Sequence, residues 1–126
     1  MVKNVKWEIT ENLAQKFLRE VPQYNAFYFF TSINNYSGTY ARSLLVFLNK
    51  LKTIDETSID FHFKRRDFEK WIRTTIGDNY LASEISKINK SLDEEELPEK
   101  VYQLVKKRLN DLKQFLANEE TYIEHK

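Results

Sequence analysis

The stretch from residue 58 to residue 72 decides the fold; it reads Ser-Ile-Asp-Phe-His-Phe-Lys-Arg-Arg-Asp-Phe-Glu-Lys-Trp-Ile. Its apolar and charged residues recur at a spacing that places them on opposite faces of a helix. The residues expected to face the core are Phe61, Phe68 and Ile72, while the basic residues are expected to face water. Ser58 and Asp67 have side chains suited to cap helix N-termini. The stretch therefore predicts helical structure with its polar residues outside.

Helical patterns continue after this stretch. A helix from Asp67 is expected to end at Gly77, in the C′ position that glycine favours, and Asp78 can cap the next helix. The apolar residues of that next helix are Leu81, Ile85 and Ile88. Pro98 suits the first turn of a last helix, and residues 118–126 beyond it are expected to be a frayed tail. The last helix carries an apolar stripe of Val101, Leu104, Val105, Leu109, Leu112, Phe115 and Leu116.

Upstream of the stretch, the pattern predicts two more helices and an aromatic segment. Thr10 is a suitable N-cap for a first helix, which Pro22 ends. A turn is expected over residues 33–38, followed by a helix over residues 39–52. The apolar stripe of that helix is Tyr40, Ala41, Leu44, Leu45, Leu48 and Leu51. The segment 24–30, Tyr-Asn-Ala-Phe-Tyr-Phe-Phe, is expected to be buried as a helix or a short strand, because periodicity does not separate the two in so short a run.

Length and composition predict one mostly α-helical domain. The chain has 126 residues, of which 41% are hydrophobic and 31% are charged, as in soluble globular proteins. A chain of this length buries roughly 65–70% of its unfolded surface in one core. Two glycines and two prolines leave few turns, which favours long helices over a sheet-rich fold. We expect a single compact domain of about five helices over residues 1–126.

Charge and cysteine content exclude several classes of function. Twenty basic and 19 acidic residues give a net charge of +1, so no overall field attracts nucleic acid or an anionic membrane. The absence of cysteine excludes disulfides, thiolate metal sites and cysteine nucleophiles, and it fits a reducing compartment. The apolar run Ala26–Phe30 is far too short to cross a bilayer, and no run near Met1 has the length of a signal peptide. We expect a cytoplasmic protein without a cofactor and without a membrane partner.

His62 is the candidate general acid or base, because histidine changes its charge near neutral pH. Asp60 and Asp67 are not three or four residues away from it, so a carboxylate partner such as Asp67 has to arrive through the fold. The alternative is a partly buried histidine that is hydrogen-bonded to the backbone. Metal binding is not expected, because the other histidine, His125, lies in the tail and no His-x-x-x-His spacing occurs.

Two basic runs, residues 64–66 and 106–108, are candidates for binding phosphate groups. The first run and a nearby arginine give the candidate binding residues Lys64, Arg65, Arg66 and Arg73. Neighbouring aromatic side chains, among them Trp71, offer surfaces on which nucleic-acid bases stack. In the alternative, the aromatic side chains face the core and the basic ones only solvate the surface. The apolar stripe of the last helix is likewise either a surface for self-association or part of the core.

Several short motifs together resemble a known family of domains. They are Ser58-Ile59-x-x-His62, Arg66-Asp67-Phe68-x-x-Trp71-Ile72, Gly77-Asp78-x-x-Leu81-Ala82, the upstream Phe27-Tyr28-Phe29-Phe30, Gly38 and Ala41-x-Ser43-Leu44, and the final Arg108-Leu109-x-x-Leu112. The pattern resembles a family of small uncharacterised archaeal and bacterial helical domains, some of which sit beside glycosyltransferases in larger proteins. The resemblance implies an accessory role and supplies no activity.

Three functions follow from these features. The chain lacks a Gly-x-Ser-x-Gly elbow and a phosphate-binding glycine loop, so we expect a non-enzymatic module that binds a protein partner or a second copy of itself. The alternative is a nucleic-acid-binding protein that uses both basic runs. The third is an enzyme that uses His62 as its acid or base.

Overall fold

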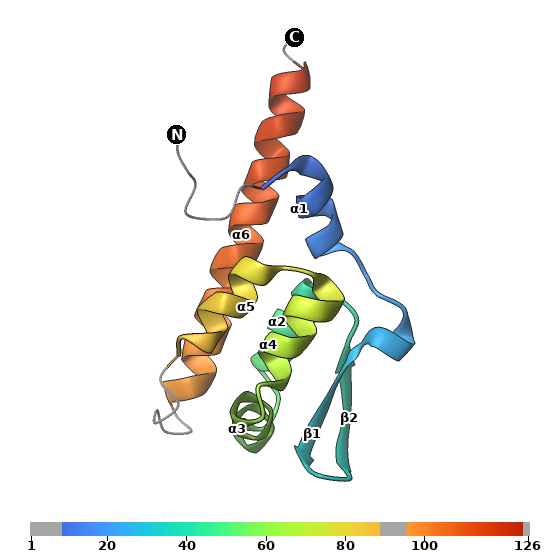
Figure 1. The fold of residues 1–126 in the computed structure, drawn as a ribbon, viewed down its shortest axis with the longest axis vertical. Helices are drawn as coiled ribbons and strands as arrows, with labels where there is room; N and C mark the ends of the chain where they lie inside the picture. The colour runs from blue at the N-terminus through green and yellow to red at the C-terminus, as the bar shows by residue number, and fades with distance from the viewer. Residues whose placement is uncertain (1–8, 89–95, 125–126) are drawn as a thin grey trace.

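Helices make up most of the molecule, and a two-stranded hairpin lies along one side of it (Figure 1). The computed structural model describes residues 9–88 and 96–124, with side chains described through residue 119. The elements in chain order are α1 (Glu11–Leu18), the short 3₁₀ helix η1 (Gln23–Asn25), β1 (Phe27–Ser32), β2 (Asn35–Ala41), α2 (Leu44–Leu51), α3 (Glu56–Lys64), α4 (Asp67–Trp71), the π-helical turn η2 (Ile72–Ile76), α5 (Asn79–Ser86) and α6 (Glu96–Glu124). The prediction of a mostly helical single domain is confirmed, with six α-helices in the described ranges.

Helix α6 runs the length of the molecule, and α1, α2, α3 and α5 all pack against it (Figure 1). Of the predicted stripe, Val101, Val105, Leu109 and Leu112 are fully buried, and Leu104, Phe115 and Leu116 are partly buried. The stripe predicted from the sequence is therefore part of the core. The helix continues through Glu124, past residue 118, where the frayed tail was expected to begin. His125 lies outside the described residues.

The aromatic segment 24–30 becomes a strand rather than a helix, since β1 takes up its second half. Strands β1 and β2 pair antiparallel, with Tyr28 opposite Tyr40. Aromatic pairs of this kind stabilise a hairpin, which explains why this part of the chain is extended. Tyr24 is an exception to the expected burial of the segment, because it lies in η1 and is 83% exposed.

The predicted helix over residues 39–52 begins only at Leu44, because its first three residues complete β2. Ser43 caps α2, since its hydroxyl oxygen accepts a hydrogen bond from the third backbone N–H after it at 3.2 Å. The turn predicted over residues 33–38 is also shorter than expected. The hairpin turns at Ile33 and Asn34, and Asn34 has a φ of 66°, a left-handed conformation that asparagine tolerates.

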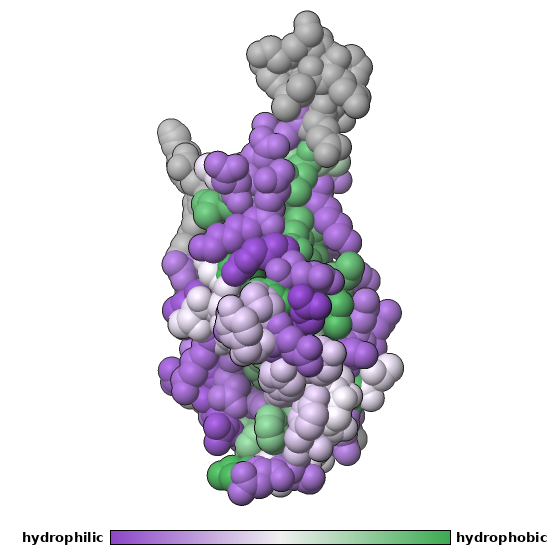
Figure 2. All heavy atoms as spheres, turned by 90° about the vertical axis from the view of Figure 1, so that its right-hand side faces the viewer, coloured by the Kyte–Doolittle hydropathy of each residue, from purple (hydrophilic) through white to green (hydrophobic). Residues whose placement is uncertain are grey.

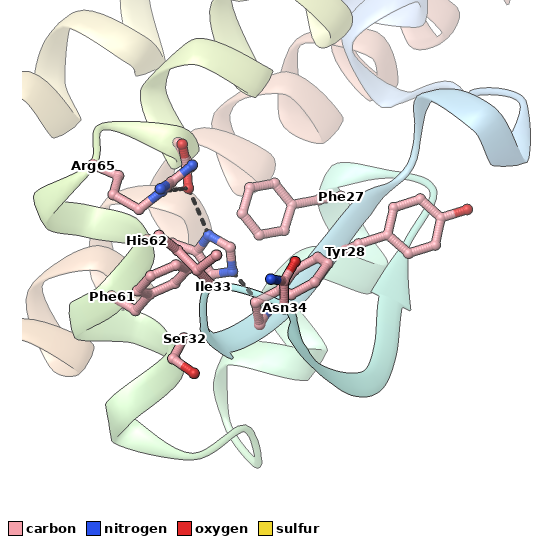
Figure 3. A pocket seen from close by; sticks show the side chains of 10 residues that line it. Phe27, Tyr28, Ser32, Ile33, Asn34, Phe61, His62 and Arg65 are labelled. Atoms are coloured by element: carbon pink, nitrogen blue, oxygen red, sulfur yellow. Dashed lines mark hydrogen bonds and ion pairs between the residues drawn. The ribbon is translucent and has the colours of Figure 1, made fainter.

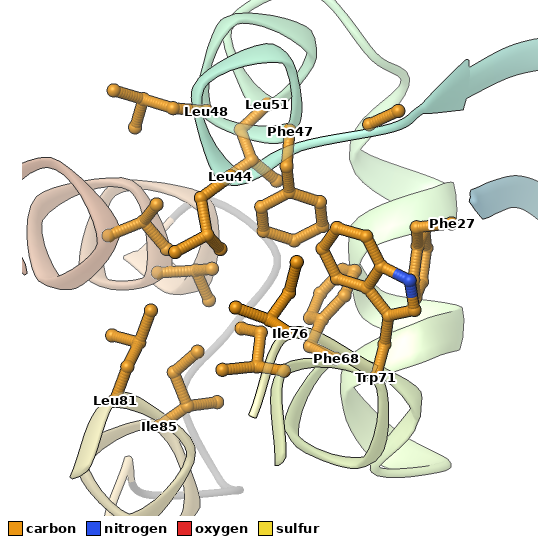
Figure 4. Close-up of a cluster of buried hydrophobic side chains, with 14 of the residues drawn as sticks. Phe27, Leu44, Phe47, Leu48, Leu51, Phe68, Trp71, Ile76, Leu81 and Ile85 are labelled. Atoms are coloured by element: carbon orange, nitrogen blue, oxygen red, sulfur yellow. The ribbon is translucent and has the colours of Figure 1, made fainter. Parts of the chain in front are cut away.

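The core gathers aromatic side chains from β1, α2 and α4 (Figure 4). The ring centroid of Phe47 lies 5.5 Å from that of Phe27 and 5.3 Å from that of Phe68, both in edge-to-face geometry. Trp71 packs beside them, and its indole N–H donates a hydrogen bond of 2.8 Å to the carbonyl oxygen of Asn25. These contacts fix the start of β1 against the helices.

Two helix caps differ from those predicted. Asp55, rather than Ser58, caps α3 by accepting a hydrogen bond of 2.8 Å from the N–H of Thr57. Ser58 lies in the first turn of the helix, where it is fully buried and its hydroxyl has no partner among the described residues. Asp67 is the first residue of α4 rather than its cap, because Arg66 occupies the capping position with a φ of 66°.

The break between α3 and α4 also changes which phenylalanine faces the core. Phe61 lies on α3 and Phe68 on α4. Because the two residues are on different helices, they do not share the single helical face that their spacing predicted. Phe63 takes the core position on α3, and Phe61 is only half-buried, which corrects the prediction for Phe61. Phe68 and Ile72 are fully buried, as predicted.

One further helix end differs from the prediction, because α1 ends at Leu18, where Arg19 is already extended, and not at Pro22. Three other helix boundaries agree with the sequence. Gly77 ends the α4–η2 segment with a φ of 95°, which favours glycine. Asp78 caps α5 and Thr10 caps α1, each accepting a hydrogen bond of 3.1 Å from the third backbone N–H after it. In the described ranges, no helix combines the length and apolar character needed to span a membrane.

A buried ion pair joins α5 to α6. Arg108 is 2% exposed and Asp78 is fully buried. The guanidinium donates from Nε to Asp78 Oδ2 at 2.7 Å and from Nη2 to Asp78 Oδ1 at 2.9 Å. Because Asp78 also caps α5, one carboxylate fixes both the start of that helix and its position against α6. Losing either partner leaves a charge buried without its counter-charge.

Replacing Asp78 by alanine should lower the free energy of unfolding by about 3–5 kcal/mol, because the buried guanidinium of Arg108 then has no counter-charge. Urea unfolding measures this change. Lys87→Ala, which breaks an exposed pair with Glu84 at 3.1 Å, is the matched control and should cost less than about 1 kcal/mol. The double variant Asp78→Ala/Arg108→Met should lose less than the two single variants added together. Strict additivity would show that the two side chains do not act as a pair.

Candidate functional site

A pocket between the hairpin and α3 is the candidate site (Figure 3). Its volume is about 400 Å³, its walls are mainly aromatic and one end is polar. The lining residues are Phe27, Tyr28, Phe30, Ser32, Ile33, Asn34, Phe61, His62, Arg65 and Asp67. Three residues singled out in the sequence, His62, Arg65 and Asp67, meet at its polar end.

His62 is 4% exposed and uses both ring nitrogens within the protein. Nε2 accepts a hydrogen bond of 2.8 Å from the backbone N–H of Phe30, and Nδ1 lies 2.8 Å from Oδ2 of Asp67. A backbone N–H only donates, so Nε2 carries the lone pair and Nδ1 carries the hydrogen that is donated to Asp67. The neutral ring therefore connects β1 to the start of α4. This is the backbone-bonded arrangement that the sequence left as the alternative to catalysis.

Asp67 reaches His62 because the chain turns between α3 and α4. The two residues are five positions apart, a spacing that does not bring side chains together on a continuous helix. The left-handed conformation of Arg66 (φ 66°) interrupts the helix and brings Asp67 back over the end of α3. Arginine rarely adopts this conformation, so no residue type in the sequence signals the contact.

The pKa of His62 lies below its ordinary value of 6.5, mainly because burial disfavours the charged imidazolium. Asp67 opposes this effect, since its hydrogen bond and its negative charge both raise the pKa, while the positive charge of Arg65 lowers it. Burial is the larger influence, so the ring is neutral at pH 7.

Arg65 completes the polar end of the pocket. Its Nε donates a hydrogen bond of 2.9 Å to Asp67 Oδ2, the oxygen that also accepts from His62. The guanidinium carbon lies 5.0 Å from the ring centroid of Phe61, in a cation–π contact. The carboxylate of Asp67 is thus engaged by two donors. The outer part of the guanidinium stays at the rim, where the Arg65 side chain is 52% exposed.

The other three candidate binding residues lie outside the pocket, and two of them are paired with acids. Lys64 Nζ lies 3.1 Å from Asp60, and Arg73 lies 3.7 Å from Glu69, each one helical turn away. Arg66 is exposed at the break between α3 and α4. Positive charge on this surface is therefore largely compensated, which weakens its attraction for phosphates.

The second basic run, residues 106–108, does not form a surface cluster. Arg108 is buried against Asp78, so it is not part of an exposed basic cluster. Lys107 lies 3.4 Å from Asp111 on the same helix. As for metals, the residues that the structure describes contain no group of three or more His, Asp or Glu side chains placed to hold one.

A row of four aromatic rings extends from the pocket over the solvent side of the hairpin, and we call it the aromatic row. It consists of Tyr40, Tyr28, Tyr36 and Phe30, whose successive centroids are 5.5, 5.7 and 5.5 Å apart. Tyr36 and Tyr40 are 43% and 37% exposed. Partial burial and the neighbouring Tyr28 and Tyr40 raise the pKa of Tyr36. Figure 2 looks toward this side, where pale and green residues gather in the lower half of a mostly purple surface.

Comparison with known proteins adds no identity to this geometry: no family model, curated protein or solved structure matches the chain. The resemblance drawn from the short motifs stays a prediction. What the pocket does has to be inferred from its own residues.

The low pKa of His62 predicts a specific loss of stability in acid. The unfolded chain takes up a proton near pH 6.5 and the folded ring takes it up only at lower pH. The free energy of unfolding should therefore fall as the pH drops below 6.5, and this contribution should level off below the folded-state pKa. Urea unfolding between pH 8 and pH 5 measures the slope.

His62→Gln is the control for this prediction, because it retains an acceptor and a donor but does not titrate. It should remove this part of the slope while lowering stability at pH 8 by about 1–3 kcal/mol, through poorer hydrogen bonds. An unchanged slope in His62→Gln would assign the acid sensitivity to other groups.

Proposed function

We propose that the protein is a non-enzymatic binding module that takes an aromatic or apolar group of a protein partner in the pocket beside His62. The observation that carries this proposal is the full engagement of the imidazole, whose two nitrogens bond Phe30 and Asp67. A general base needs a lone pair that faces the substrate, and here the lone pair on Nε2 faces a backbone N–H. In this proposal, the role of His62 is therefore to hold the walls of the pocket in place.

The composition of the pocket supports recognition of an apolar group. Phe27, Phe30 and Phe61 supply flat apolar walls, and Ile33 lies at the mouth, 70% exposed (Figure 3). Pockets that bind small apolar groups combine such walls with a few polar atoms at defined points. The guanidinium of Arg65 provides such a point at the rim.

The aromatic row supports a protein as the partner. Tyrosine is enriched at protein interfaces because its ring contributes apolar contact area while its hydroxyl stays hydrogen-bonded to water or the partner. Tyr28 lines the pocket and also belongs to the row. A partner side chain in the pocket would therefore be flanked by a surface suited to contact the rest of the partner.

The nucleic-acid alternative has less support. Binding of that kind depends on unpaired Lys and Arg side chains that displace counterions. Lys64 and Arg73 each face an acid four residues earlier in the chain, and Arg108 is buried. The charge distribution therefore favours the binding-module hypothesis.

Titration with p-cresol, which is the side chain of tyrosine in isolation, tests this proposal. Amide shifts in ¹H–¹⁵N spectra should concentrate at residues 30–34 and 61–65, with a dissociation constant on the order of 1 mM for so small a probe. Phe61→Ala should weaken binding several-fold because it removes one wall. Leu45→Ala is the control, since Leu45 is 44% exposed on α2, away from the pocket. Shifts that are absent or spread evenly over the protein would refute the proposal.

A further inference from the structure

The hairpin lies in a long segment without charge. Residues 21–41, between Glu20 and Arg42, contain no Asp, Glu, Lys, Arg or His, although 31% of the chain is charged. Natural proteins usually place charged residues on exposed strands to prevent unwanted pairing. Here β2 is exposed along most of its length and carries none. An exposed strand without charge is therefore open to contact with another molecule.

The same segment carries most of the exposed large apolar side chains of the described residues. They are Leu13, Tyr24, Ile33, Tyr36, Tyr40 and Leu45, and four of the six lie within residues 21–41. Tyr24 is the most exposed, at 83%. It sits in η1 at the base of the hairpin, whereas the pocket opens toward the hairpin tip at Ile33 and Asn34 (Figure 3).

We propose that the protein forms a two-fold dimer in which Tyr24 of each copy enters the pocket of the other. The proposal rests on the proposed function, because it names the partner of that pocket as a second copy of the chain. A two-fold axis across the hairpin places the base of one hairpin against the tip of the other. Each protomer then contributes one tyrosine and one pocket, so the two junctions are equivalent.

The absence of charge is what favours a second copy over an unrelated partner. An isologous interface brings identical residues near one another across the axis, so any charge close to the axis would meet its like. The segment over residues 21–41 imposes no such repulsion, and the net charge of the chain is only +1. The aromatic row reaches η1, where the Tyr28 hydroxyl donates to the carbonyl oxygen of Gln23 at 2.8 Å, and it reaches the pocket at Phe30. Ring-to-ring contacts across the axis would be formed between these two points.

A dimer formed by pairing the hairpin strands of two copies is less favourable than one formed through Tyr24 and the pocket. The register of the hairpin shifts between Phe29 and Phe30, and Ser37 and Gly38 form a bulge on β2 there. The N–H of Thr39 is already bonded to the hydroxyl of Ser37 at 3.2 Å. Such a bulge twists an edge away from pairing. In the proposed dimer, the two copies therefore contact each other through the solvent side of the hairpin and the pocket, and not through paired strands.

Sedimentation velocity over the micromolar range tests the dimer. Wild-type protein should show concentration-dependent dimerisation, and Tyr24→Lys should raise the dissociation constant by about 30-fold or more, as expected for a buried interface tyrosine. Tyr24 is 83% exposed, so the circular dichroism of the variant should match wild type. Leu45→Lys is the matched control, because it adds the same charge at an exposed apolar position outside the segment and should leave the dimer intact.

A mixing experiment separates the exchange of Tyr24 from a general loss of apolar surface. Ile33→Lys places a charge at the mouth of the pocket and should also give a monomer. Mixing Tyr24→Lys with Ile33→Lys should restore a heterodimer, because one intact tyrosine then meets one intact pocket. Dimers that persist in Tyr24→Lys, or mixtures that stay monomeric, would refute the proposal that Tyr24 of each copy enters the pocket of the other.

The binding of p-cresol to monomeric Tyr24→Lys distinguishes this inference from the proposed function. A wild-type protein that is monomeric at all concentrations but binds p-cresol retains the pocket and rules out the second copy as its occupant. A protein that neither dimerises nor binds p-cresol refutes both. Tighter binding of p-cresol to Tyr24→Lys than to wild type is the result expected if Tyr24 competes for the pocket.

Discussion

The hydrogen bonds of His62 are the constraint on which the hairpin side of the molecule depends. A two-stranded hairpin is marginal in water by itself and needs a packed face or a helix beside it. Phe27 and Phe29 provide the packed face, while His62 accepts the N–H on the outer edge of β1 at Phe30. Without that acceptor, a buried edge would carry an unsatisfied donor. The imidazole thus completes the sheet where a third strand would otherwise be needed.

The pocket is a by-product of the same arrangement. Since His62 and Asp67 hold the hairpin at a fixed distance from the end of α3, the aromatic walls cannot close on one another. Site residues held by packing and hydrogen bonds present a preformed surface, which lowers the entropy lost on binding. The hydrogen bonds that occupy both ring nitrogens of His62 are therefore also the ones that would preform the pocket in the proposed binding role.

The parts of the fold that follow local rules were predictable from the sequence. The helix end at Gly77, the cap at Asp78 and the stripe of α6 all depend on residues a few positions apart. Other features depend on distant contacts. Residues 39–41 pair with β1 instead of joining α2, and strand pairing outweighs helical periodicity at such short range.

The candidate site was predictable only in part. His62 and Asp67 were identified by their chemistry, but their contact requires the left-handed conformation of Arg66, which no residue type in the sequence signals. The role of Arg108 was misread for a similar reason. Its partner Asp78 is 30 positions away, so the basic run looked like a surface cluster when one of its members belongs to the core.

The uncharged hairpin also bears on how the chain folds. Before β1 docks, residues 26–31 (Ala-Phe-Tyr-Phe-Phe-Thr) combine high β-propensity with no charge and no proline, the composition of segments that assemble into cross-β fibrils. Hairpins form from local contacts in microseconds, whereas the ring that covers this edge is contributed by α3, about thirty residues later in the chain. Native folding and aggregation therefore compete during that interval, and the time α3 takes to dock sets how long the segment stays exposed.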